Sequence, residues 1–356
     1  MAAPAPGRAA RGLRRARAEA RHAVRRARRG LRSARKRVRK QIQWFGWRPV
    51  VELLRPLDAL GIPVVAPYAA GSRWLARIWA LPAVERRLVR RVARSCPEHP
   101  VAGRSGPLRA DERERFFSSL FLTTWRLNAL ARCPDEVFRR CVSLEGPEHV
   151  EKARAAGRGV IFASAHHGAA EAMSVALGRV GIAPHCFAAV EFERRLLRGR
   201  SGWPLQVIVR APGRASGLRA MAQARAVLKG RGAVLILADG GKGQVDVELP
   251  FLGGTQRFAQ GFATLALVSG APVVPVFGIP GPQGRVAVRF LPPLDAGAPE
   301  WPRSRRIRHL VAQYARHLEE RLLEDPLLIK SVDLEGMRRH GSWDAAALRA
   351  AATSGS

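Results

Sequence analysis

The residues best suited to chemistry lie in one short stretch, residues 163–171 (ASAHHGAAE). It follows a predicted strand and leads into a predicted helix over about 169–180. His166 and Glu171 are five residues apart, whereas side chains on one continuous helix meet at three or four. Across a strand–turn–helix corner, a carboxylate in the first helical turn can accept the imidazole N–H and raise the basicity of the other nitrogen. The pattern predicts a general base; the competing interpretation is a pair of helix-capping histidines with a surface glutamate.

The sequence contains no motif for several other chemistries. There is no HExxH and no third ligand near the two histidines, so we expect no metal. The four cysteines form no CxxC pair, which argues against a zinc ribbon and fits a reducing compartment. GxGxxG after the first strand, GxxxxGK(S/T) and GxSxG are all missing. Nucleotide-cofactor and α/β-hydrolase folds therefore have little support.

The elements that must position these residues begin near residue 157. Short apolar segments predict six strands, at 159–165, 185–190, 205–210, 233–239, 272–279 and 285–291. Between and after them, helices are predicted over 216–229 with Ser216 as N-cap, over 258–269 and over 301–325. Apolar strands that alternate with helices predict an α/β fold, a mostly parallel mixed sheet of about six or seven strands flanked by helices. Ligands bind at the carboxyl ends of such strands, which is where His166 lies.

Charge is concentrated at the N-terminus of a chain whose net charge is +33. Residues 1–50 hold seventeen Lys and Arg against one acidic residue, Glu19. A thin apolar line through residues 13–42, followed by Trp44, Phe45 and Trp47, predicts an interfacial helix on an anionic membrane surface. A disordered basic tail is the alternative. Nucleic acid is not the expected partner, because the tail lacks interleaved aromatic residues for base stacking.

Four regions follow from these patterns. Residues 1–48 are the Arg-rich tail or interfacial helix, and 49–150 a helical, membrane-associated region. Residues 151–330 are the α/β core, and 331–356 a C-terminal tail, expected to be disordered from about 345. The weakly polar run at 59–80 is interrupted by Pro, Gly and Arg, so we expect no transmembrane span.

Several blocks in the same order resemble one known family. AHHGAAE is similar to the His-x4-Asp/Glu motif of the lysophospholipid acyltransferase superfamily, in the form found in bacterial lipid A biosynthesis (lauroyl/myristoyl) acyltransferases. Four further segments resemble blocks of that family in the same order. They are 207–210 with the helix to Lys229, 232–239 (GAVLILAD), 247–253 (VELPFLG) and 270–277 (GAPVVPVF). The resemblance covers roughly residues 90–325. It implies a glycerolipid acyltransferase-like fold with a helical N-terminal region.

The resemblance also implies roles for individual residues. His166 is the general base on an acceptor hydroxyl, and Glu171 orients it. The donor is a thioester of acyl-carrier protein or coenzyme A, with no acyl-enzyme and no bound cofactor. Arg210 holds phosphate of the lipid acceptor, and Arg214, Lys242 and Arg257 are the further candidates for this role. Asp239 contacts substrate or caps its strand. Phe251, Leu252 and Gly253 shape the acyl or acceptor pocket.

This family implies an enzyme at the cytoplasmic face of the inner membrane, bound peripherally, that acylates a lipid A precursor or a related (glyco)lipid. The sequence departs from the family at Gly240, which replaces Gln, and at Ala169 and Ala170, which replace Asn-Trp. These departures leave open a lysophospholipid or glycerolipid acceptor. A second class of function is a non-catalytic, basic membrane- or nucleic-acid-binding protein on the same fold.

Overall fold

The computed structural model describes most of the chain from residue 82 onward. The described residues are 82–97, 99–102, 106–110, 112, 113, 115, 116, 130, 131, 133–189, 206–210, 214–239, 246–281, 285–329, 331–344 and 346–354. The chain divides into two compact units, residues 1–62 and 63–356, and every described residue belongs to the second. The predicted interfacial helix and the run at 59–80 lie outside the described residues. The four predicted regions remain predictions.

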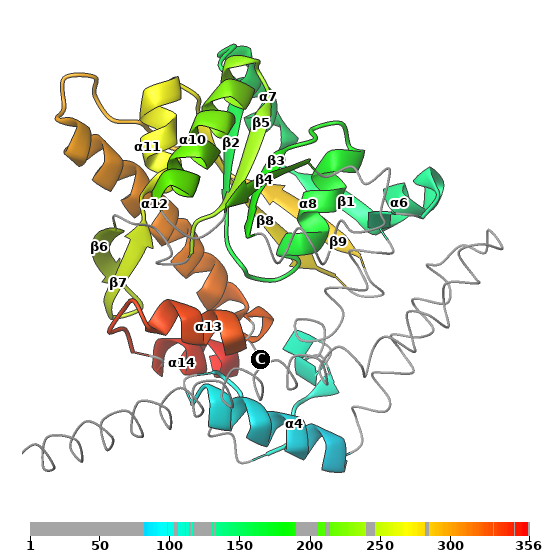
Figure 1. The fold of residues 1–356 in the computed structure, drawn as a ribbon. Coiled ribbons are helices and arrows are strands. Elements are labelled where there is room, and N and C mark those ends of the chain that lie inside the picture. Colours follow the sequence, from blue (N-terminus) through cyan, green and yellow to red (C-terminus); the bar gives the residue numbers. More distant parts are fainter. Residues whose placement is uncertain are drawn as a thin grey trace, which may run out of the picture. The chain divides into compact units, whose positions relative to one another are not determined.

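A seven-stranded sheet forms the centre of the second unit (Figure 1). Its strands are β1 (Val142–Glu145), β2 (Val160–Ser164), β3 (His185–Ala189), β4 (Gln206–Arg210), β5 (Ala233–Leu237), β8 (Val273–Pro280) and β9 (Val286–Phe290). They lie in the order β1-β9-β8-β2-β5-β3-β4, and all neighbours are parallel except β8 and β9. The predicted α/β fold with a mostly parallel mixed sheet is confirmed.

Helices cover both faces of this sheet, and the central strand β2 is buried at every position. Val160 and Phe162 pack on one face with α7 (Pro147–Ala155) and α8 (Ala170–Arg179). Ile161 and Ala163 pack on the other face with α10 (Arg214–Lys229), α11 (Gly261–Ser269) and α12 (Arg303–Glu324). Figure 1 shows these two helical layers on opposite sides of the strands. All five residues of β2 are buried, as a strand at the centre of a three-layer fold requires.

Two strand features were missed by the sequence prediction. β1 lies in a region predicted to be mostly helical, and its partly exposed residues form no apolar run. The second is an antiparallel hairpin of β6 (Asp246–Phe251) and β7 (Gly254–Ala259), whose turn has positive φ angles at Leu252 and Gly253. Phe258 pairs with Val247 in this hairpin, so the helix predicted from 258 begins at Gly261 instead.

Other predicted boundaries were also wrong. α10 begins at Arg214, so Ser216 lies inside the helix and is not its N-cap. Residues 346–354 were expected to be disordered but form a helix, α14 (Ala346–Ser354). Its Leu348 is completely buried and belongs to the same apolar cluster as α12. Burial of an apolar face therefore stabilises α14 as a helix, although its Ala-rich sequence is typical of a disordered tail.

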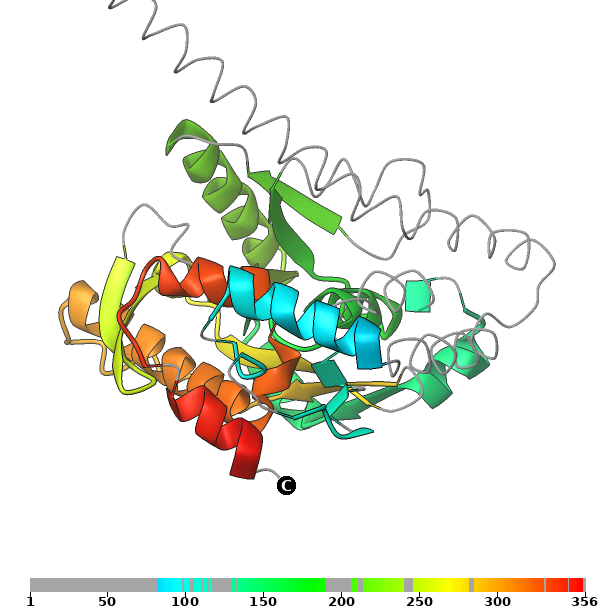
Figure 2. The same ribbon diagram turned by 90° about the horizontal axis from the view of Figure 1, so that it is seen from below.

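The remaining described helices lie around this core. They are α4 (Pro82–Ser95), α6 (Asp135–Cys141), α13 (Ser331–Arg338) and a short 3-10 helix, η2 (Pro326–Leu328). Figure 2 shows α4 beside α13, with which it is in contact. No helix in the described part of the chain is long and apolar enough to cross a membrane.

Candidate active site

The carboxyl ends of β2 and β5 bring His166 and Asp239 together. These strands are parallel neighbours, and their last residues, Ser164 and Leu237, are paired. His166 follows the end of β2 by two residues, and Asp239 follows the end of β5 by two. Because parallel neighbours end at the same edge of a sheet, equal offsets place the two side chains side by side.

Three contacts join the pair. Nδ1 of His166 is 3.0 Å from Oδ1 of Asp239 and 3.2 Å from Oδ2. The backbone N–H of His166 donates to Oδ2 at 2.7 Å. The carboxylate therefore holds both the main chain and the ring of the histidine. A neutral imidazole that donates from Nδ1 keeps its lone pair on Nε2.

Asp239 is negatively charged in this setting. Its burial would by itself raise the pKa of the carboxyl, but the positive charge of His166 when it is protonated and the hydrogen bonds that His166 donates outweigh burial and lower that pKa. The Asp239 side chain is only 5% exposed, whereas that of His166 is 35% exposed. The pair thus consists of a buried anion that orients a solvent-accessible base. Such an arrangement can take a proton from a hydroxyl group.

A tight turn carries the chain from His166 into α8. Gly168 has a φ of +61°, and a Cβ at this position would collide with the carbonyl oxygen of Gly278 on β8. The next amide, of Ala169, donates to that same carbonyl at 2.8 Å. Only glycine fits so close to the neighbouring strand in this conformation. Glu171 lies in the first turn of α8 with a half-buried side chain, and its predicted role as the partner of His166 remains a prediction.

The second histidine of the motif points into the protein. His167 is 7% exposed, and its Nε2 donates to the carbonyl oxygen of Asp325 at 3.0 Å. Its backbone forms an isolated antiparallel bridge with Ile329. Burial lowers the pKa of His167, which keeps the ring neutral and in its donor role. Its neighbours make it a structural residue that anchors the segment after α12 to the site.

The other predicted site residues lie at different places. Arg210 ends β4 on the same edge of the sheet as His166, and its backbone pairs with Ala189. Phe251 is buried, packed edge-on against Phe258, and Gly253 forms the hairpin turn with a φ of +73°. Lys242 lies outside the described residues. A role in substrate binding remains a prediction for each of these positions.

A phosphate-binding role for the remaining cationic candidates, Arg257 and Arg214, also stays a prediction. Arg257 is exposed on β7, and its backbone N–H donates to the carbonyl oxygen of His340 at 2.8 Å. Arg214 is the first residue of α10. Within the described part of the chain, no group of three or more His, Cys, Asp or Glu side chains is arranged to hold a metal ion.

Sequence reasoning did not identify the contact of Asp239 with His166. The signal was present: an acidic residue directly after a fully apolar strand, in the block that resembles the family. Asp239 is 73 residues from His166, so their contact cannot be predicted without knowing the order of the strands. Tyr314, whose phenol donates to the carbonyl oxygen of Ser164, was missed without any such signal.

The comparison with protein families agrees with this site. Residues 35–325 match the family model described as bacterial lipid A biosynthesis acyltransferase, which is most of the chain. The protein is therefore an enzyme that transfers acyl groups. Its His166–Asp239 pair lies at the carboxyl ends of the strands, where ligands bind in α/β sheets. The chain belongs to the bacterial lipid A biosynthesis acyltransferase family. No curated protein matches the sequence significantly.

Proposed function

We propose that this enzyme moves a fatty acyl chain from a thioester of acyl-carrier protein or coenzyme A to a hydroxyl of a lipid A precursor or a related (glyco)lipid. His166 is the general base, and Asp239 orients it. The observation that carries the proposal is the set of three contacts from one buried carboxylate to the ring and backbone of His166. This leaves Nε2 as the basic nitrogen on a partly exposed ring.

The reaction then proceeds in two proton-balanced steps. Nε2 of His166 accepts the hydroxyl proton while the oxygen attacks the thioester carbonyl carbon. The resulting tetrahedral intermediate collapses, the C–S bond breaks, and the imidazolium returns its proton to the thiolate. The products are an ester and a free thiol, and no acyl-enzyme forms. The charge of Asp239 stabilises the imidazolium during the first step.

A cationic face on α4 supports an anionic membrane surface as a partner. Arg86, Arg90 and Arg94 recur every four residues and, with Arg87, line a hollow of about 360 Å³. All four side chains are exposed. Within the described part of the chain, none of them forms an ion pair. Exposed arginines on one helix face are suited to lipid phosphates, each contributing about 1 kcal/mol near an anionic surface. We therefore infer peripheral attachment to the cytoplasmic face of the inner membrane.

The alternatives differ in what they predict for activity. A non-catalytic binding protein has no need of a buried carboxylate aligned on an exposed histidine. A glycerolipid or lysophospholipid acyltransferase shares the same pair, so the acceptor has to be determined by experiment. Purified enzyme is incubated with acyl-carrier-protein and coenzyme A thioesters and with a lipid A precursor, a lysophospholipid or a glycolipid. Mass spectrometry identifies the acceptor that gains one acyl chain.

The base is tested in the same assay. His166→Ala should reduce turnover by ~10²–10⁴-fold without changing the fold, because it removes the base and not the core. His167→Gln is the matched control and should cost less, since an amide can still donate to the Asp325 carbonyl. Near-parental turnover by folded His166→Ala protein would refute the mechanism. A larger loss from His167→Gln would show that the base is misassigned.

Membrane attachment is tested by sedimentation with anionic vesicles. Replacement of Arg86, Arg90 and Arg94 by Gln should weaken binding by up to roughly 100-fold at low salt, with less effect as salt rises. The control removes three exposed arginines from α10 and α12 (Arg219, Arg225 and Arg316), so both variants lose the same charge. Equal binding by the two variants would exclude a specific role for α4.

A further inference from the structure

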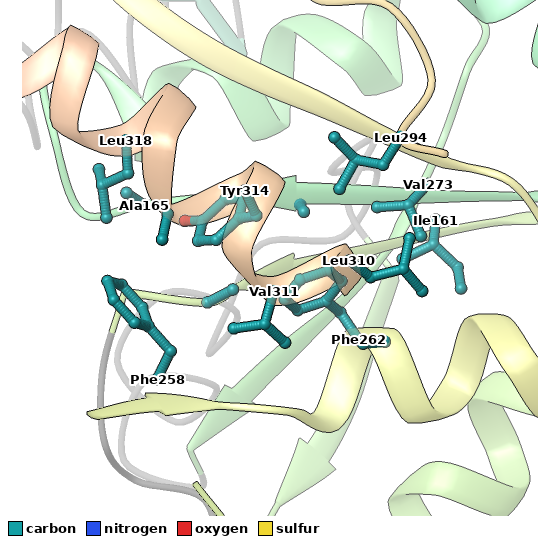
Figure 3. Close-up of a cluster of buried hydrophobic side chains, with 14 of the residues drawn as sticks. Ile161, Ala165, Phe258, Phe262, Val273, Leu294, Leu310, Val311, Tyr314 and Leu318 are labelled. Atoms are coloured by element: carbon teal, nitrogen blue, oxygen red, sulfur yellow. The ribbon is translucent and has the colours of Figure 1, made fainter. Parts of the chain in front are cut away.

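A buried tyrosine contacts the backbone of β2 just before His166. Tyr314 belongs to α12 and is completely buried. Its phenol donates to the carbonyl oxygen of Ser164 at 2.6 Å. Figure 3 shows the phenol oxygen beside Ala165, the residue between Ser164 and His166. The hydroxyl thus reaches the backbone two residues before the base.

The carbonyl group of Ser164 also accepts a hydrogen bond from the segment that carries Asp239. Ser164 O accepts the backbone N–H of Ala238 at 2.7 Å, and Ala238 directly precedes Asp239. One oxygen therefore receives two hydrogen bonds, one from α12 and one from the segment that follows β5. These bonds fix the end of β2 against the segment that follows β5, where both functional side chains begin.

The environment of Tyr314 keeps the phenol a donor and holds it in place. Burial raises its pKa well above the ordinary value, and the negative charge of Asp239 raises it further. Its ring packs against Phe262 on α11, with ring centroids 5.3 Å apart and planes inclined by 59°. A wholly buried ring needs no hydroxyl in order to pack, so the polar group at this position requires a separate reason.

We infer that Tyr314 is a positioning residue for catalysis, an inference that rests on the proposed function. Its hydrogen bond to Ser164 holds the end of β2 in the register that aligns His166 with Asp239. Catalytic groups must stay within about 0.5 Å of their productive geometry. A displacement of about 1 Å, even from a residue remote from the reacting atoms, can cost about 10²-fold in rate. The phenol itself touches no reacting atom.

The test is Tyr314→Phe, which removes the hydroxyl and keeps the ring. The fold should survive, because the carbonyl of Ser164 keeps its bond from Ala238. We expect kcat to fall roughly 10- to 100-fold with KM nearly unchanged. Ser269→Ala is the matched control, since the Ser269 hydroxyl also donates to a backbone carbonyl, that of Leu265 at 2.7 Å, in a part-buried hydrogen bond. It should leave kcat unchanged.

A readout independent of turnover separates positioning from packing. In protein labelled with ¹⁵N-histidine, the Nδ1 proton of His166 is assigned by its loss in His166→Ala. Tyr314→Phe should shift or broaden this resonance, whereas Ser269→Ala should not. An unchanged resonance and an unchanged kcat in Tyr314→Phe would overturn the inference. If His166→Ala is itself fully active, the proposed function fails instead, and the two failures are distinguishable.

Discussion

The buried His99 makes the stability of the protein depend on pH. This residue follows α4, and its Nε2 donates to the carbonyl oxygen of Ile329 at 3.0 Å. Its Nδ1 accepts the backbone N–H of Val101 at 3.3 Å. Burial lowers the pKa of His99 from 6.5 to about 4, although the bond to Ile329 acts in the opposite direction. The ring is therefore neutral in the folded protein at pH 7.

The size of the effect follows from the two pKa values. Between about pH 6.5 and pH 4, His99 is protonated in the unfolded chain and neutral in the folded chain. The free energy of unfolding therefore falls as the pH is lowered. Over the whole window this difference costs about 3 kcal/mol. Roughly 2 kcal/mol of it is lost between pH 7 and pH 5. The buried His167, whose pKa is also lowered by burial, acts in the same direction.

The assay is urea unfolding followed by the fluorescence of the eight tryptophans at pH 7, 6 and 5. His99→Gln keeps a donor toward Ile329 but cannot titrate. The free energy of unfolding of this variant should lose about 2 kcal/mol less than the parent between pH 7 and pH 5. His317→Gln on α12 is the control, because it removes a partly exposed imidazole and leaves the buried one. If His99→Gln shows the full pH dependence of the parent, the assignment of that dependence to His99 is refuted.

Two further substitutions test the site and the turn that carries it. Asp239→Asn should lower kcat by roughly 10²–10⁴-fold, because an amide neither stabilises the His166 imidazolium nor fixes its tautomer; a steady-state assay with unchanged kcat would contradict this role. Gly168→Ala should destabilise the protein by at least about 2 kcal/mol, since the new Cβ meets the Gly278 carbonyl at a positive φ. Gly217→Ala on α10 meets no atom within 4 Å and should instead be neutral or stabilise by up to about 1 kcal/mol; equal melting temperatures for the two variants would refute the steric argument.

The sequence by itself determined the class of fold and the position of His166, the proposed base. The six strands of the sheet that it predicted are all present, because short apolar runs bounded by glycine or proline are a local property of the chain. It also placed His166 at the end of β2, where the chain turns into α8. The order of several motifs was enough to predict the family.

Only the tertiary structure decided which groups surround that base. Asp239 is 73 residues from His166 and reaches it because β5 lies next to β2, a strand order that no local pattern encodes. Tyr314 is 150 residues from Ser164, and on α12 it reads in sequence as one more apolar position. β1 was missed for the same reason, since its partner β9 is remote in the sequence. The hairpin of β6 and β7 is local, with a turn of two residues, and it was missed although its pairing needs no distant segment. Contacts between distant segments depend on the register of packed elements, which the chain fixes only when it is folded.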